Sequence, residues 1–393
     1  MRELIDLAGK LIAFDSRSSV SNLPLVEFLE DELADFTLER VTYFDPAGVE
    51  KAALVACAGP AGKPRIALSG HLDTVPPAGW SRDPFLAEVV DGRLFGLGAS
   101  DMKGPVAAAI TAARVLAAET AVMLLLTTDE ETTKEGARRI VDASSLVATD
   151  APVGIIVVEP TSLRCVRGHR VDIKFEAVAH GRQAHSSTAA GSNANLRLIP
   201  FLAEMRGLHL ELRQRADLQD PAYDPAWCDL NIVVDNHGAA PNVTVGRATC
   251  RMKFRYSKAI DPSEIVERVR SAAATQGLEL DVRREAPPPE LDPAHPLVEA
   301  AVAVTGRAAH VVGFGTDASE LTRAAPCIVL GPGSIDDAHR PDESIALAEL
   351  EAGVSTLVAV GRRAAERLGS EQQIAHGPAT NHDNRNSPAK SEP

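Results

Sequence analysis

Three consecutive acidic residues, Asp129, Glu130 and Glu131, follow the strand-like run VMLLLTT. Carboxylates this close repel one another, and bringing them near a core costs free energy unless a cation compensates their charge. A solvated helix start is the simplest explanation, because acids are favoured near the positive end of a helix dipole. The alternative is a bound cation, and the other polar residues of the chain bear on that choice.

Other candidate ligands also follow short apolar runs. IALSG leads to His71 and Asp73, and GIIVV leads to Glu159. CIVLGPGSIDDA leads to His339, and LFGLGAS leads to Asp101. Functional crevices in open α/β sheets lie at the carboxyl ends of the strands, so we expect all five segments to converge on one edge.

The residue types at these positions indicate a metal site. Two imidazoles with three or more carboxylates are typical ligands of zinc, cobalt or manganese rather than magnesium. The spacing of His71 and Asp73 suits a ligand whose other ring nitrogen is held by a carboxylate. Five ligands exceed the usual three of one catalytic zinc, so we expect two metal ions about 3.5–4 Å apart with a bridging carboxylate. One of Glu130 and Glu131 would bind metal, and the other would be free as a base.

Composition excludes several classes of function. The 393 residues carry 54 acidic and 40 basic side chains and a net charge of −14, which disfavours nucleic acid and anionic membranes as partners. No apolar run approaches the roughly 20 residues of a membrane span. The first 17 residues predict an amphipathic helix rather than a secretion signal. The five scattered cysteines favour a reducing cytoplasm and argue against a thiolate zinc site.

The flanking elements predict a layered α/β domain, because helical and strand patterns alternate through residues 1–169. Strands are expected at 64–70, 92–98, 121–128, 153–159 and 327–333, with helices at 104–119 and 346–368. Residues 369–393 are polar and aperiodic, so we expect a disordered tail in which His376 and His382 are solvated.

The middle of the chain has a different pattern. Strands are expected at 171–179, 229–235, 249–257 and 278–285, and helices at 193–208 and 262–276. The order β-α-β-β-α-β is that of a ferredoxin-like unit. We therefore predict an inserted domain at 170–286 between the two parts of a catalytic domain, 1–169 and 287–368.

The segments SGHLDTVP, GLGASDMKG, DEE, VEPTSL and GPGSIDDAHRPDE resemble a known family in order and spacing. It is the family of dinuclear-zinc amidohydrolases and exopeptidases, which includes acetylornithine deacetylase, succinyl-diaminopimelate desuccinylase and the glutamate carboxypeptidases. The resemblance spans about residues 5–365, and GWSRDPF and LGPGSIDDAHRPDES are most similar to acetylornithine deacetylase. It implies a zinc-exopeptidase-like α/β catalytic domain with an inserted ferredoxin-like α+β lid and dimerisation domain.

The resemblance also implies a role for each matching residue. His71 and Glu159 would hold one metal ion, Glu131 and His339 would hold the other, and Asp101 would bridge them. The ions would be zinc or cobalt. Asp73 would orient His71, and Glu130 would be the general base that activates water and passes the proton to the leaving amine. The bond between Asp101 and Met102 matches a non-proline cis peptide of the family.

In the inserted domain, the resemblance implies residues that complete the site. His185, in HGRQAHSS, matches a histidine that in dimeric relatives reaches the partner's site and stabilises the oxyanion. Asn242 and Arg255 match a pair on the central hairpin, where Arg255 would bind the substrate α-carboxylate with help from Arg170. Without the resemblance, His185 would be read as a loop histidine and Arg255 as an exposed strand cation.

Some positions depart from the family's pattern. Val158 precedes the glutamate of VEPTSL where a small residue is usual, and Val171 stands where a glycine normally opens the lid. The usual proline after the lid histidine is absent from HSSTAAGSNA. Because every metal and base position is intact, the chemistry is better supported than the identity of the substrate.

The leading prediction is a cytoplasmic homodimer, joined through 170–286, that hydrolyses an N-acyl-L-amino acid. N-acetyl-L-ornithine, cleaved to L-ornithine and acetate in arginine biosynthesis, is the first candidate substrate. Succinyl-diaminopimelate, acetylcitrulline, acetyl-lysine and short peptides are alternatives. The intact ligand set disfavours a catalytically silent scaffold. A nucleotide-binding oxidoreductase rests only on Gly96-x-Gly98, which lacks the third glycine of the dinucleotide motif.

Overall fold

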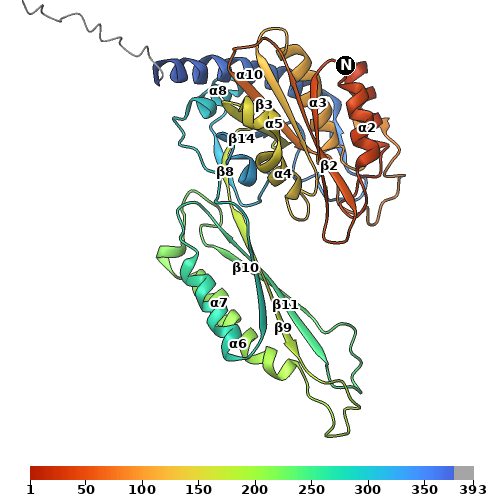
Figure 1. Cartoon of the computed structure of the whole chain (residues 1–393), viewed down its shortest axis with the longest axis vertical. Coiled ribbons are helices and arrows are strands. Elements are labelled where there is room, and N and C mark those ends of the chain that lie inside the picture. Colours follow the sequence, from red (N-terminus) through yellow and green to blue (C-terminus); the bar gives the residue numbers. More distant parts are fainter. Residues whose placement is uncertain (376–393) are drawn as a thin grey trace, which may run out of the picture.

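The larger part of the molecule is built on an eight-stranded sheet (Figure 1). In spatial order its strands are β1 (Thr37–Phe44), β2 (Glu50–Ala58), β6 (Ala121–Thr127), β3 (Arg65–His71), β7 (Gly154–Pro160), β14 (Cys327–Gly331), β8 (Val166–His169) and β13 (His310–Val312). The central strands β6, β3, β7 and β14 run parallel, and β2 joins β6 antiparallel. Parallel strands are buried on both faces, which explains their continuous apolar runs.

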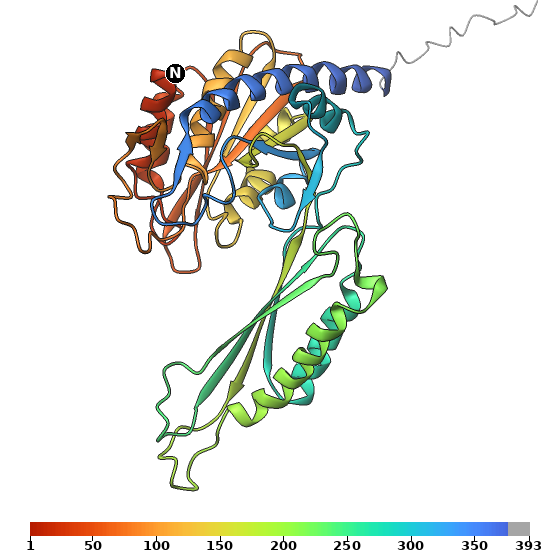
Figure 2. The same ribbon diagram turned by 180° about the vertical axis from the view of Figure 1, so that it is seen from behind.

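Helices cover both faces of this sheet (Figure 2). On one face lie α1 (Arg2–Ile12), α2 (Leu23–Glu32), α3 (Lys103–Leu116), α8 (Pro296–Thr305) and α10 (Leu347–Ala375). On the other lie α4 (Glu135–Ala143), α5 (Ser145–Thr149) and α9 (Ala318–Leu321). Successive strand residues point to opposite faces, so Leu124 and Leu126 of β6 pack in the first core and Met123 and Leu125 pack in the second.

A small sheet corrects one sequence prediction. The strand expected at 92–98 is wrong in extent, because only β5 (Arg93–Phe95) is extended. It pairs with β4 (Glu88–Val90) and β15 (Ser344–Ala346) rather than with the main sheet. Gly98, with φ of +84°, turns the chain after β5, and a left-handed conformation of this kind favours glycine. Asp101 therefore reaches the site on a turn and not at the end of a central strand.

A second unit projects from the first and has its own core (Figures 1 and 2). Along the chain it contains β9 (Val171–His180), α6 (Asn195–Leu212), the 3₁₀ turn η1 (Ala216–Leu218), β10 (Asp229–Asp235), β11 (Arg247–Tyr256), α7 (Ser263–Thr275) and β12 (Glu279–Arg284). Its sheet is antiparallel in the order β10-β11-β9-β12, and α6 and α7 cover one face. This is the predicted β-α-β-β-α-β arrangement, so the predicted fold class is confirmed.

The carboxyl-terminal helix corrects another prediction. The structure describes residues 1–375, and α10 continues through residues 369–375, where a disordered tail was expected. A Cβ at Gly369 would lie 2.2 Å from Pro64 Cγ, so this glycine permits a close contact and does not end the helix. The Glu, Gln and Ala that follow favour helix. The rest of the predicted tail, with His376 and His382, lies outside the described residues. Within the described residues, no helix is long and apolar enough to cross a membrane.

Candidate metal centre

Parallel pairing brings three of the predicted segments to one edge of the main sheet. β3 ends at His71, β7 carries Glu159 at its end, and the chain leaves β6 two residues before Asp129. β3 lies between β6 and β7 in parallel register, so their carboxyl ends are adjacent. Loops from elsewhere in the chain bring Asp101 and His339 to the same place.

The Asp101 carboxylate lies between the two histidines. Its Oδ1 is 3.0 Å from Nε2 of His71, and its Oδ2 is 3.3 Å from Nε2 of His339. Nε2 of His339 is 2.9 Å from Oε1 of Glu131, and Nε2 of His71 is 3.9 Å from Oε1 of Glu159. All five predicted ligands are thus brought together, in the two pairs around Asp101 that the motif resemblance implies. The Asp101–Met102 peptide bond is cis, as predicted.

This cluster fits a pair of divalent cations. Ligand atoms of His71, Asp101 and Glu131 lie within 4.8 Å of one another, a spacing at which such side chains can bind metal. Glu159 is buried, and burial raises its pKa well above the usual range of a carboxyl group. Burial likewise raises the pKa of Glu130 to about 8. Divalent cations would compensate the charge of these carboxylates, and two imidazoles with three carboxylates are the donors that zinc and cobalt accept.

The first of the three consecutive acids is compensated by the protein itself. Oδ1 of Asp129 lies 3.3 Å from Nζ of Lys51, and the Tyr43 hydroxyl donates to its Oδ2 at 2.7 Å. Lys51 is fully buried and also donates to the carbonyl oxygens of Ser18 and Val20. Asp129 therefore faces away from the metal ligands and has a structural partner. Of the other two acids, Glu130 has the positive charge of the buried Lys134 nearby, and Oε1 of Glu131 lies 2.9 Å from Nε2 of His339.

Asp73 contacts more of the site than the sequence indicated. Its carboxylate accepts the backbone N–H groups of Glu130 and Glu131 at 3.2 and 3.4 Å and the Ser18 hydroxyl at 2.7 Å. Nδ1 of His71 is 2.9 Å from the Asp73 carbonyl oxygen and 3.6 Å from its Oδ1. The closest partner of the ring is thus the backbone of Asp73, and the carboxylate mainly fixes the turn that carries the base.

A further buried acid, Asp317, lies at the start of α9 and was not predicted from the sequence. The Thr127 hydroxyl donates to its Oδ2 at 2.5 Å, and burial raises its pKa to about 6. Its charge acts on the neighbouring Glu130 and raises the pKa of that base further. An acid between the glycine-rich GFGT turn and a short helix is the sequence signal that could have revealed it.

Two of the predicted site residues lie at the far tip of the second unit. β9 leaves the first unit at Val171 and runs to His180, and His185 follows beyond that end (Figure 1). Residues 185 and 243 form an isolated bridge, and the Ser186 N–H donates to the carbonyl oxygen of Asn242 at 2.9 Å. His185 and Asn242 are therefore together, exposed, and at the opposite end of the sheet from the metal ligands.

The two predicted arginines have partners within their own unit. Arg255 lies on the open face of the sheet, 3.3 Å from Asp172 and 3.5 Å from Asp229. Arg170 is buried, donates to the Pro225 carbonyl oxygen at 2.6 Å and lies over the Tyr223 ring. Within the described residues, neither guanidinium contacts a predicted metal ligand.

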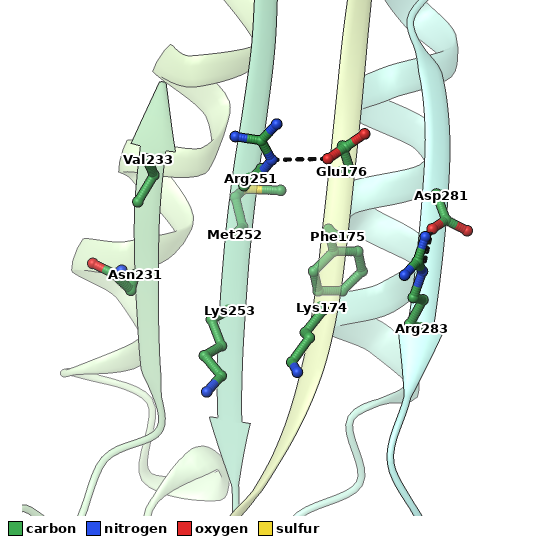
Figure 3. A pocket seen from close by; sticks show the side chains of 10 residues that line it. All are labelled: Lys174, Phe175, Glu176, Asn231, Val233, Arg251, Met252, Lys253, Asp281 and Arg283. Atoms are coloured by element: carbon green, nitrogen blue, oxygen red, sulfur yellow. Dashed lines mark hydrogen bonds and ion pairs between the residues drawn. The ribbon is translucent and has the colours of Figure 1, made fainter. Parts of the chain in front are cut away.

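The open face of the second sheet also carries a pocket lined by ten residues, none of them from the metal cluster (Figure 3). Two ion pairs lie in this lining, with Arg251 2.9 Å from Glu176 and Arg283 2.7 Å from Asp281, and Lys174 and Lys253 add positive charge. Lys174 reaches out of this face to donate to the Thr132 carbonyl oxygen at 2.8 Å. This contact joins the second unit to the loop that carries Glu130 and Glu131.

Comparison with known proteins identifies the family. The model of peptidase family M20/M25/M40 matches residues 67–363. The chain belongs to this family. An acetylornithine deacetylase from Myxococcus xanthus is 34% identical over 373 residues, covering 87% of this chain and 92% of that protein. This M20 chain is therefore an enzyme of the metal-dependent amidohydrolase type, and the resemblance of its motifs is confirmed.

Solved structures of M20 proteins share the fold. A metallo-carboxypeptidase from Sulfolobus solfataricus superposes with a TM-score of 0.73 at 16% identity, covering 93% of this chain and 100% of that chain. A dinuclear metal-binding peptidase from Bacillus subtilis gives a TM-score of 0.60 at 16% identity, covering 94% and 98%. These likenesses extend over both units of the molecule.

Proposed function

We propose that this M20 protein hydrolyses the amide bond of an N-acyl-L-amino acid, with N-acetyl-L-ornithine as the first candidate substrate. The observation that carries the proposal is the arrangement of four ligand side chains in two pairs around Asp101, with an adjacent carboxylate, Glu130, left outside the ligand set. The likeness to an acetylornithine deacetylase supports the choice of substrate. A role in arginine biosynthesis and a location in the cytoplasm are part of the proposal. Succinyl-diaminopimelate, acetylcitrulline, acetyl-lysine and short peptides are the alternative substrates.

The chain's own residues would divide the work as follows. His71 and Glu159 would hold one metal ion, Glu131 and His339 would hold the other, and Asp101 would be shared by both. Zinc or cobalt bound there would polarise the amide carbonyl and lower the pKa of the attacking water. Glu130 takes a proton from the water and delivers it to the nitrogen of the leaving amine. The Asp73 carboxylate accepts the backbone N–H groups of Glu130 and Glu131 and so fixes the turn that orients the base and the ligand.

We further propose that residues 170–286 act as a lid and as the dimer contact. β10 is an edge strand whose Val233 and Val234 are 50% and 46% exposed. The opposite edge, β12, carries the charged residues Glu279, Asp281 and Arg283, which discourage pairing. Two β10 edges related by a two-fold axis would extend the sheet and cover the valines.

A dimer of this kind also explains the position of the lid tip. His185 and Asn242 lie far from the metal ligands of their own chain, and the partner's site is where they would act. His185 would donate to the oxyanion, and Asn242, Arg255 and Arg170 would hold the carboxylate end of the substrate.

The test uses the purified enzyme with and without metal. Exhaustive chelation should abolish hydrolysis, and zinc or cobalt should restore it. A panel of N-acetylornithine, acetylcitrulline, acetyl-lysine, succinyl-diaminopimelate and dipeptides should give the highest kcat/KM with N-acetylornithine. Full activity in a verified metal-free preparation would contradict the metal chemistry. A preference for dipeptides would replace the deacylase with a peptidase.

A further inference from the structure

A buried carboxylate outside the ligand set, Glu343, holds the turn that carries Asp101. Its side chain accepts the backbone N–H groups of Ser100 at 2.7 Å, Asp101 at 2.8 Å and Gly98 at 3.2 Å. Its own carbonyl oxygen accepts the N–H of Gly96 at 3.1 Å. Glu343 is only 3% exposed. One residue thus receives four main-chain N–H groups from a single turn.

No strand or helix supplies hydrogen-bond acceptors for these backbone N–H groups. The turn lies between β5 and α3, where the backbone follows neither ladder nor helix. Buried N–H groups without a partner are costly, and successive N–H groups that point inward form a natural cradle for a carboxylate. Glu343 fills this cradle from a segment more than 240 residues further along the chain. The direction of the turn, and therefore of the Asp101 side chain, depends on it.

The position of Glu343 also ties this turn to a second ligand. It follows His339 by four residues and directly precedes β15, which pairs with β5 through Ser344 and Phe95. The loop that presents His339 and the turn that presents Asp101 are therefore joined at Glu343. Nε2 of His339 and Oδ2 of Asp101 are 3.3 Å apart.

We propose that Glu343 is a positioning residue of the metal centre, which holds the Asp101 carboxylate between His71 and His339 before metal binds. This inference rests on the metal site of the proposed function but not on its substrate. Residues that orient metal ligands typically change metal affinity by about 10–100-fold when they are replaced.

Three variants separate positioning from bulk stability. Glu343→Ala removes every acceptor and should weaken metal binding about 10–100-fold without removing a ligand. Glu343→Gln keeps the Oε1 acceptor for Ser100 and Asp101 and should lose less than about tenfold. Asp342→Asn is the control, because the neighbouring Asp342 carboxylate accepts from Ser81 and Arg82 on the other side of the loop. Its metal affinity should match that of the unaltered protein.

The measurement is competition for zinc against a chromophoric chelator, together with thermal unfolding of each metal-free variant. The proposal predicts a graded loss of affinity, Ala more than Gln, which exceeds that of Asp342→Asn. An Ala variant with a lower melting temperature but unchanged affinity would overturn it, because Glu343 would then be structural only. If the Ala variant does not fold, Glu343→Asp replaces it, because the shorter side chain cannot reach all three donors. Unaltered metal affinity in both Glu343→Gln and Glu343→Asp would then overturn the proposal.

The same experiment distinguishes this inference from the proposed function. If the unaltered protein takes up two metal ions and the Glu343 variants bind as tightly, only the positioning role fails. If the unaltered protein takes up none, the metal site fails and the positioning role fails with it. If the variants lose affinity but no acylated amino acid is hydrolysed, the positioning role stands and the proposed substrate class fails.

Discussion

The metal cluster and the lid tip differ in how far one chain can prepare them. His71, Asp101 and Glu159 are buried at the ends of packed strands or on a braced turn, and each has a close polar neighbour. His185 and Asn242 are exposed on loops, and their contacts are with other residues of the same tip. Under the proposed function, the metal ligands are positioned within one chain, whereas His185 and Asn242 would meet a substrate only at the site of a second chain.

The physical reason lies in the supporting structure. Strand ends in a parallel sheet are fixed by neighbours on both sides, so a ligand there keeps its place without help. Loop tips have few neighbours and adapt to a partner, which is why recognition residues are often found on them. In this molecule the metal ligands lie in the first unit, and His185 and Asn242 lie beyond the end of the second sheet that is away from that unit.

The largest expected effect falls on the metal cluster. Glu130→Gln should lower kcat by about 10²–10⁴ while leaving metal content nearly intact, because it loses a base and no ligand. Glu131→Gln should also lower metal occupancy, since its Oε1 lies 2.9 Å from Nε2 of His339 in the ligand pair. Metal analysis of both variants beside steady-state kinetics checks this division. Equal metal content and similar rates in the two variants would show that the roles are assigned wrongly.

A smaller effect is expected at the lid tip. His185→Ala should lower kcat by about 10²–10³, the usual loss for one oxyanion donor, with metal content unchanged. His180→Ala is the matched control. This exposed histidine lies at the end of β9, five residues before His185, and its Nε2 is 3.0 Å from Glu279. Equal activity of His185→Ala and His180→Ala would contradict the role proposed for His185.

The sequence predicted best where one local pattern determines the position of a residue. The apolar runs that end near His71 and Glu159 are enough to predict a strand, its burial and the edge of the sheet at which the ligand lies. Asp101 was expected at the end of a similar run, but β5 belongs to a separate small sheet, and Gly96 and Gly98 then turn the chain so that Asp101 lies on a turn. Its direction is fixed by Glu343, a residue distant in sequence.

Contacts between residues distant in sequence explain the other differences between the predictions and the structure. Lys51 follows Glu50 at the start of an otherwise apolar strand, and its sequence neighbours give no sign that it compensates Asp129. Asp317 became a neighbour of Glu130 only through the packing of α9 against the main sheet. The last helix was expected to end at residue 368, since the contact of Gly369 with Pro64, 305 residues away in sequence, leaves no local signal. Charge pairing and close packing across the fold cannot be read from the spacing within one segment.

The most direct test of the account mixes two inactive variants, His185→Ala and Glu130→Gln, under conditions that exchange subunits. In a mixed dimer, one site combines a working Glu130 with the partner subunit's working histidine, and the other site has neither. With random exchange, half of the dimers are mixed, so about a quarter of the original activity should return. Confirmed exchange without any recovery would contradict the claim that each active site joins the metal centre of one chain to the lid tip of another.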